Sequence, residues 1–405
     1  MATVHLYALR RWSGWYNSPG SYEIAKRYGQ LANSRLWDGL FPGPKCEPAA
    51  LFGLDGKPGP AFLAARSGSN LPSTGHPAYL LARRARDLAP IASVRGRRTT
   101  PAAVTLVDLA HVPPTTFHPG KTTGAHGYLA LLPIGASVAA AVVCALLADW
   151  WCFASIALGI VAGGVASLVI GAGTLEFTHP TPARGAPPGD GVLLDGYATL
   201  VVRGPEAAVG ALTRGGFRLE YAGAPAFAPI GWCSVLLTAQ FLGQLLLVPQ
   251  GTLFGGLMFV ASIVVSWAYN TYLSSIDCED VQTELLFERV LKIAPGAVRK
   301  IELPSRTAMV VFACLALQCD RPVLNPHKIL GDLIPNDTPV WQRWKGIVAE
   351  KCLAGRTVPF SDTDWKVDGL TEEETELLQM LFEDAEDAQQ AWQTLNDTTP
   401  RTKST

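Results

Sequence analysis

The fold is decided by the stretch from Tyr128 to Ala172, which reads YLALLPIGASVAAAVVCALLADWWCFASIALGIVAGGVASLVIGA. Residues 128–147 and 151–172 contain no Asp, Glu, Lys or Arg. Each run is long enough to cross a hydrocarbon core of roughly 30 Å as a helix. Only Ala148, Asp149 and Trp150 separate the two runs, so the chain must turn back at once. This stretch therefore predicts a tight hairpin of two transmembrane helices.

A second pair of apolar runs follows further along the chain. Phe227 to Val248 and Thr252 to Tyr272 also lack charged residues, and only residues 249–251 lie between them. The whole chain of 405 residues is 17% charged, and its mean hydropathy of +0.20 is high for a soluble protein of this length. We therefore predict a mainly α membrane protein with four transmembrane helices arranged as two tight hairpins.

The basic residues predict the orientation of these hairpins. Neither hairpin turn carries a Lys or Arg, whereas every polar segment that flanks a span does. By the positive-inside rule, both termini and the central loop of this integral membrane protein should be cytosolic. The N-terminus has Arg10 and Arg11 where a signal peptide would need an apolar core. The basic residues that set the orientation are Arg95, Arg97, Arg98, Lys121, Arg184, Arg203, Arg214, Arg218, Arg289 and Lys292.

The polar parts of the chain divide around hairpins at 128–172 and 227–272. Residues 1–127 form a basic, Pro/Gly-rich cytosolic region with 15 Lys and Arg against 6 Asp and Glu. Residues 173–226 read as a small cytosolic α/β insert of strand, helix and strand. Residues 273–397 are expected to form a cytosolic helical domain, and residues 398–405 a disordered tail.

Local signals support the helical domain. Ala308 to Leu317 is apolar but too short to span, so we expect a buried or a re-entrant helix. Pro339 stands at the first turn of a helix that carries Trp344. Thr371 and Glu374 have the spacing of a capping box, which predicts that another helix begins there.

The second predicted span carries a small residue at every fourth position. Such a stripe lets another backbone approach closely. We expect it to pack against Ala136, Ala140 and Cys144 of the first span, although a dimer interface would use the same stripe. The predicted helix-packing residues are Ser155, Gly159, Gly163, Ser167 and Gly171.

Polar side chains recur within the third and fourth spans. Gln240 and Gln244 share one face of the third span, and Asn270 lies on the fourth. Amides in lipid seek partners on other helices, so we expect structural hydrogen bonds rather than a path for a solute. Asp149, at the first hairpin turn, should cap the N-terminus of the second span.

The sequence offers no catalytic, cofactor-binding or metal site. His111, His118 and His126 are spaced by seven and eight residues, with no Cys or carboxylate at a metal-site interval. The eight cysteines form no C-x-x-C pair and predict no disulfide framework. A formal net charge of −1 gives no reason to expect nucleic acid as a partner.

Two motifs in the second half carry a resemblance. Ser274-Ser275-Ile276-Asp277 through Leu286, and Leu333 through Trp341 with Trp344-Lys345, resemble a family of uncharacterised multi-pass membrane proteins of mushroom-forming fungi. The resemblance covers the chain from Phe227 onward. It implies a fungal membrane protein and supplies no catalytic residues.

Three functions are compatible with these features. The leading hypothesis is a non-enzymatic anchor or interaction protein that binds the lipid bilayer and a cytosolic protein, with anionic headgroups meeting its basic N-terminal region. One alternative is a small-solute transporter or channel, in which Gln240, Gln244 and Asn270 line a hydrated path. The other is a membrane-embedded lipid-modifying enzyme, for which His126 and Asp277 are the obvious candidates.

Overall fold

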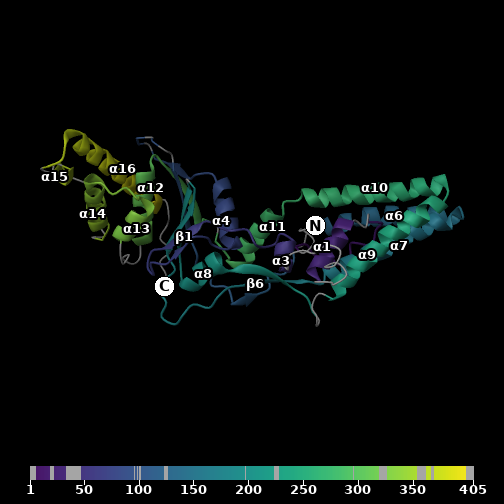
Figure 1. The fold of residues 1–405 in the computed structure, drawn as a ribbon. Coiled ribbons are helices and arrows are strands. Elements are labelled where there is room, and N and C mark those ends of the chain that lie inside the picture. Colours follow the sequence, from purple (N-terminus) through teal and green to yellow (C-terminus); the bar gives the residue numbers. More distant parts are fainter. Residues whose placement is uncertain are drawn as a thin grey trace. The chain divides into compact units, whose positions relative to one another are not determined.

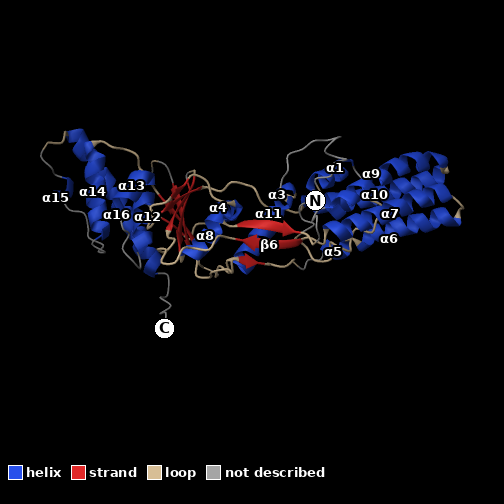
Figure 2. Cartoon of the chain, turned by 60° about the horizontal axis from the view of Figure 1, so that its bottom comes forward, coloured by secondary structure: helices blue, strands red, loops and turns tan. Residues whose placement is uncertain are grey.

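The chain folds into two compact units, each assembled from three segments. The computed structural model describes residues 6–18, 22–32, 47–94, 96–97, 99, 102–122, 126–196, 198–222, 228–294, 296–318, 326–353, 362–365 and 369–397. The first unit, which we call the bundle unit, comprises Met1–Gly56, Thr116–Thr178 and Phe217–Leu285. The second, the sheet unit, comprises Lys57–Thr115, His179–Gly216 and Leu286–Thr405. Figures 1 and 2 show the elements of both.

Four long helices dominate the bundle unit: α6 (Leu131–Leu146), α7 (Trp150–Ile170), α9 (Ala228–Leu247) and α10 (Leu253–Ser275). α7, α9 and α10, and α6 together with the residues from Gly127 that precede it, are long and apolar enough to cross a membrane, and the described part of the chain has these four candidates. Many of their large apolar side chains point outward, and Leu146 and Leu253 are 80% and 85% exposed. The predicted number and position of the apolar helices are confirmed.

The four helices do not pack as two equal pairs. Helix α6 packs against both α7 and α10, and α7 also packs against α9 (Figure 2). A short 3₁₀ helix, η2 (Val248–Gln250), connects α9 to α10. Yet within the described residues α9 and α10 are not closely packed together, whereas the short helix α1 (Tyr22–Leu31) packs closely on α9. The second pair of helices is therefore spread apart and leaves room for another segment.

Short elements complete the bundle unit. A three-stranded sheet has the order β5 (Thr116–Phe117), β6 (Thr174–Thr178), β9 (Gly216–Glu220). Its buried rings Phe177 and Phe217 meet edge to face, with centroids 5.3 Å apart. The remaining helices are α3 (Pro48–Leu51), α5 (His126–Leu129) and α11 (Cys278–Glu284).

The sheet unit is built on a seven-stranded sheet whose order is β2-β1-β7-β8-β4-β10-β3. The β8/β4 and β10/β3 pairs are parallel, and the other pairs are antiparallel. In register, Thr105 of β4 lies between Leu200 of β8 and Lys300 of β10. The strands are β1 (Ala61–Ala64), β2 (Asn70–Leu71), β3 (Ala92–Ser93), β4 (Ala102–Asp108), β7 (Gly191–Asp195), β8 (Ala198–Arg203) and β10 (Val298–Leu303).

Helices cover this sheet because its central strands are apolar on both faces, as buried parallel neighbours usually are. Helix α12 (Arg306–Gln318) packs on β4 and β8, while α4 (His76–Asp87) contacts β8 and α8 (Glu206–Arg214). Residues 308–314 of α12 are all buried, which favours the buried-helix alternative over the re-entrant one. The remaining helices are α13 (Pro326–Leu333), α14 (Pro339–Leu353), α15 (Asp362–Trp365) and α16 (Glu372–Asp397).

The predicted local signals in the C-terminal helices are confirmed. The Thr371 hydroxyl accepts from the Glu374 N–H at 3.2 Å, and Glu374 Oε2 accepts from the Thr371 N–H at 2.9 Å. Trp344 of α14 is fully buried where α14 packs against α16, and its indole N–H donates to the Leu381 carbonyl of α16 at 2.9 Å. The capping box joins residues three apart, and the Trp344 hydrogen bond joins two neighbouring helices. The local pattern of residues was therefore sufficient to predict these helices.

The predicted strand, helix and strand of residues 173–226 are present as β8, α8 and β9. Strand β8 pairs with β4 and β7 in the seven-stranded sheet, whereas β9 belongs to the three-stranded sheet. Strand β7 directly precedes β8 in the chain, whereas β4 lies far away in sequence; pairing with both leaves neither edge of β8 open.

Candidate functional site

The N-terminal segment comprises residues 6–18, and the C-terminal end of this segment lies between the helices of the bundle. Asn17 is completely buried, and its backbone N–H donates to Ser137 Oγ of α6 at 3.0 Å. Its side-chain Nδ2 donates to Ser262 Oγ of α10 at 2.7 Å, and its Oδ1 accepts from Gln244 Nε2 of α9 at 3.2 Å. One residue outside the four helices thus binds three of them, and this segment fills the space between α9 and α10.

The small-residue stripe on α7 accommodates the same segment. A Cβ on Gly159 would collide with Asn17 Oδ1, and one on Gly163 would lie 3.0 Å from the Tyr16 carbonyl. Further along, a Cβ on Gly14 would collide with Ser167, and one on Gly171 would lie 2.7 Å from Arg11 Cα. Ser155, at the start of the stripe, is buried and offers its carbonyl to Gln244.

This neighbour differs from the predicted one. We expected the stripe to pack against Ala136, Ala140 and Cys144 of the first span. Ala140 and Cys144 of α6 instead share a buried cluster with Cys152 and Ile156, which lie nearer the hairpin turn of α7. The close approach that small residues allow is used here by the irregular backbone of the N-terminal segment, much of which forms turns.

The polar residues of the third and fourth helices bond to this N-terminal segment. Gln240 Nε2 donates to the Ser18 carbonyl at 2.9 Å, and Gln244 Nε2 also donates to the Ser155 carbonyl at 3.0 Å. The Tyr16 hydroxyl donates to Asn270 Oδ1 at 2.9 Å. Among the described atoms, Gln240 Oε1 is buried without a partner. The three predicted intramembrane polar residues therefore all make hydrogen bonds with the N-terminal segment.

Asp149 joins the two turns at the other end of the bundle. Its Oδ1 accepts from the Cys152 N–H at 3.1 Å, which caps α7 as predicted. Its Oδ2 accepts from the N–H and the hydroxyl of Thr252 at 2.8 and 2.6 Å. The hydrogen bond from the Thr252 hydroxyl is the main reason that the pKa of Asp149 lies below its ordinary value. One carboxylate thus fixes the starts of α7 and α10 together.

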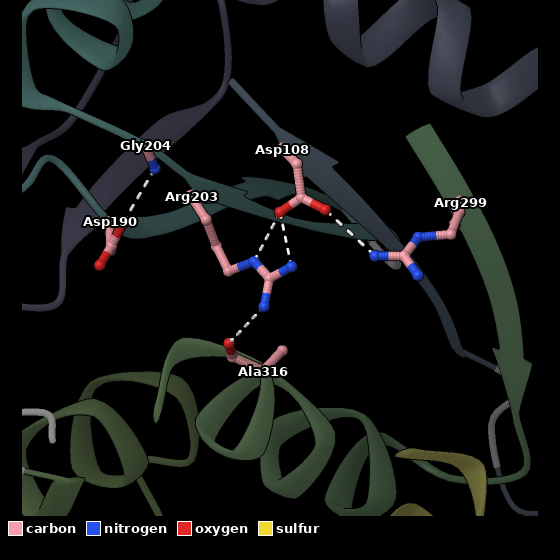
Figure 3. A network of polar contacts seen from close by, with 6 residues as sticks. All are labelled: Asp108, Asp190, Arg203, Gly204, Arg299 and Ala316. Carbon is pink, nitrogen blue, oxygen red and sulfur yellow. Dashed lines mark hydrogen bonds and ion pairs between the residues drawn. The ribbon is translucent and has the colours of Figure 1, made fainter. Parts of the chain in front are cut away.

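A second candidate site, in the sheet unit, is a charged pocket (Figure 3). The parallel strands β4 and β8 end at Asp108 and Arg203, which places the two side chains next to each other. Arg203 Nε and Nη2 lie 2.7 and 2.6 Å from Asp108 Oδ1, and its Nη1 donates to the Ala316 carbonyl at 3.2 Å. Arg299 Nη2 lies 3.1 Å from Asp108 Oδ2. Asp108 is therefore held by two guanidinium groups.

A second ion pair closes the other side of this pocket. Arg66 Nε lies 2.7 Å from Asp190 Oδ2, and Asp190 Oδ1 accepts from the Gly204 N–H at 2.9 Å. Gly204 has φ +154°, and a Cβ there would collide with the Leu109 carbonyl, so a larger residue would strain this turn. A cavity of about 440 Å³ lies among these residues.

Ligands of open α/β sheets commonly bind outside the carboxyl ends of parallel strands, which is where this pocket lies. Arg66 and Arg203 of the cavity lining pair with Asp190 and Asp108, so the charges that line the pocket balance each other. The ion pairs of the pocket join these charged groups to one another. Paired charges around a cavity are suited to binding a polar ligand.

The sequence analysis missed this pocket because its residues are far apart in the chain. Only the ends of two strands gave a local signal, since the apolar runs AAVTLV and ATLVV each stop at a charged residue, Asp108 and Arg203. Which charges would meet depended on the strand order, which no local pattern contains.

The candidates for enzyme chemistry take structural positions or lie outside the described part. Asp277 Oδ1 accepts from the Glu279 N–H at 2.8 Å and caps α11. The side chain of His126 lies outside the described residues. His118 Nε2 lies 3.4 Å from Glu176 Oε1 on the three-stranded sheet. Within the described residues, no group of three or more His, Cys, Asp or Glu side chains could hold a metal ion.

Comparisons with known proteins add no family to this picture. No protein-family model, no curated protein and no solved structure matches the chain. The resemblance to fungal multi-pass membrane proteins stays a prediction from the two motifs that carry it.

Proposed function

We propose that this protein is a membrane anchor that holds an interaction unit at the cytosolic surface, and that it has no transport or catalytic activity of its own. In this proposal the four apolar helices cross the bilayer as two tight hairpins, and both termini are cytosolic. The outward apolar side chains of the helices support embedding in lipid, since a water-exposed surface of this kind is rare in soluble proteins. The basic residues around the spans support the orientation.

The observation that carries the proposal is the filled centre of the bundle. A hydrated path would need polar side chains with free hydrogen-bonding groups along the interior. Here Gln244 and Asn270 bond to Asn17 and Tyr16, and Gln240 bonds to the Ser18 carbonyl. The polar groups thus fix the N-terminal segment in place rather than line a channel.

The sheet unit is the part that we assign to interaction. Its charged pocket, with Arg66, Asp190 and Arg203, is a candidate position for a polar group of a cytosolic partner. The acidic first turn of α16, with Glu372, Glu373 and Glu374, adds an exposed negative surface. Anionic lipid headgroups are the partner that we propose for the basic N-terminal region.

Two measurements test this function. After carbonate washing, the expressed protein should stay in the membrane pellet, and tags at either terminus or near Arg184 should be accessible only from the cytosolic side. Recovery of the protein in the supernatant, or a tag near Arg184 on the side opposite to both ends, would contradict the membrane proposal.

Transport is tested separately with the purified protein in liposomes. We expect no flux of ions or small solutes for the natural protein, because the N-terminal segment fills the bundle. The variant Asn17→Ala, in which the N-terminal segment loses hydrogen bonds to the bundle, is measured beside the natural protein. Solute flux through the natural protein above that of empty liposomes would refute the anchor function and favour the transporter.

A further inference from the structure

An apolar groove lies on the outside of the bundle between α6 and α10. Its volume is about 380 Å³, and its walls include Leu132 and Pro133 of α6 and Val264 and Val265 of α10. Almost no polar atom is exposed in it. The groove lies at the start of α6 and the end of α10, so it opens at the end of the bundle where the chain leaves the apolar helices.

Tyrosines mark one end of this groove. Tyr269 and Tyr272 line it, and Tyr272 is 40% exposed. The ring of Tyr269 meets that of Tyr16 edge to face, with centroids 5.7 Å apart. Aromatic side chains with a polar tip are typical of the depth at which lipid headgroups begin. The groove therefore spans from the headgroup level into the apolar region.

Positive charge lies beside the tyrosines. The Arg10 side chain lies within hydrogen-bonding reach of Tyr16 and Tyr269, and its Nε and Nη1 atoms are buried without a hydrogen-bond partner among the described residues. Arg11 is exposed, and its guanidinium lies 5.8 Å from the centroid of the Trp12 ring. Neither arginine has an ion pair with a carboxylate in the described part of the chain.

A third cation strengthens this basic end. Lys121 Nζ donates to the Gly171 carbonyl at the end of α7 at 2.8 Å. Burial, and after it the nearby charge of Arg11, lowers the pKa of Lys121. Several cations close together favour an anion at this place.

We propose that the groove and the adjoining Arg10 and Arg11 form a binding site for one anionic phospholipid. An acyl chain lies along Leu132 and Val264, and the headgroup phosphate accepts hydrogen bonds from the Arg10 guanidinium beside Tyr269 and from the exposed guanidinium of Arg11. Guanidinium groups suit phosphate because they donate two parallel hydrogen bonds. The net negative charge of an anionic lipid compensates the positive charge of the arginines. A zwitterionic headgroup compensates this charge to a smaller extent. This inference rests on the proposed membrane embedding.

The test uses the full chain purified in detergent and native mass spectrometry with phosphatidylglycerol or phosphatidylcholine of the same acyl chains. The natural protein should bind one molecule of phosphatidylglycerol, and it should bind this lipid more tightly than phosphatidylcholine. In the double variant Arg10→Gln with Arg11→Gln, the apparent affinity for phosphatidylglycerol should fall about tenfold or more. Arg218→Gln removes an exposed arginine of β9 in the same unit and should leave the affinity unchanged.

A groove variant keeps the inference testable if the arginine variant misfolds. Ala268→Phe fills the groove from the lipid side while both arginines remain, and it should also lower phosphatidylglycerol retention about tenfold. Val161→Phe, at an exposed position on α7 away from the groove, is the matched control and should bind as the natural protein does.

Equal affinities for the two lipids, or equal effects of the groove variant and its control, would overturn the site. These results are distinguishable from failure of the proposed function. A protein that resists carbonate extraction yet shows no headgroup preference refutes the lipid site alone. Release by carbonate refutes the membrane proposal on which the site rests.

Discussion

Replacing Gly159 by alanine should destabilise the bundle, because the N-terminal segment occupies the space that a side chain would need. A Cβ at Gly159 would collide with Asn17 Oδ1 and would lie 2.9 Å from Gln244 Nε2. Asn17 cannot withdraw freely, since its Nδ2 bonds to Ser262 Oγ at 2.7 Å. Overpacking of this kind typically costs about 1–3 kcal/mol, which outweighs the gain of up to about 1 kcal/mol from alanine in a helix.

The variant Asn17→Ala removes two side-chain hydrogen bonds, to Ser262 and from Gln244. At about 0.6 kcal/mol for a hydrogen bond between apolar helices, this change should cost about 1 kcal/mol. In the double variant the alanine at 159 meets no Asn17 side chain, although Gln244 Nε2 stays close. The two changes should therefore be non-additive, with a coupling of about 1–2 kcal/mol in favour of the double variant.

Equilibrium unfolding of the full chain in mixed micelles, for the natural protein and the three variants, measures this coupling. Gly256→Ala is the matched control, because it is also a glycine of an apolar helix and nothing lies within 4 Å of its added Cβ. The control should be as stable as the natural protein or more stable. Additivity within about 0.3 kcal/mol would show that Asn17 does not lie against Gly159 and would refute the filled bundle.

Three further predictions concern single side chains. Asp384 is fully buried, and this burial raises the pKa of its carboxyl although Arg97, 3.1 Å away, acts in the opposite direction. The free energy of unfolding should therefore fall as the pH rises above 3.8, the ordinary pKa of Asp. Asp384→Asn should remove this fall when urea unfolding is measured over a series of pH values. The pKa of Asp149 is lowered, so its carboxylate stabilises the folded protein fully above pH 3.8, and this stabilisation is lost as the pH falls below that value. In Asp149→Asn, the melting temperature should therefore change less with pH in this acidic range. Trp344→Phe removes the hydrogen bond to Leu381 and leaves a cavity, which should cost about 2–3 kcal/mol in urea unfolding followed by circular dichroism, and an unchanged midpoint would contradict the buried position.

Features that depend on neighbours in the chain could be predicted without coordinates. The four apolar helices follow from runs of uncharged residues, because the length and composition of each run are local properties. The cap at Asp149 and the capping box at Thr371 and Glu374 follow from spacings of three residues. Even the buried helix at 308–317 could be distinguished from a span by its length.

The placement of the N-terminal segment needed the tertiary structure. Residues 6–18 are too short and too polar to be recognised as part of an apolar core, and their basic residues predicted a cytosolic region. The amides of Gln240 and Gln244 showed that partners were required, but not that Asn17 and Ser18 would supply them. A hydrogen bond across more than 200 residues leaves no periodic signal in either segment.

The charged pocket shows the same division. A strand within residues 173–226 could be predicted, yet the meeting of Asp108 with Arg203 and Arg299 required β4 to lie between β8 and β10. Strand order is set by the burial of the whole sheet and by the pairing of every edge, which are sums over segments far apart in the chain. Composition and spacing thus determine which segments are apolar helices or strands, whereas the packing of distant segments decides what fills the bundle and which charges meet.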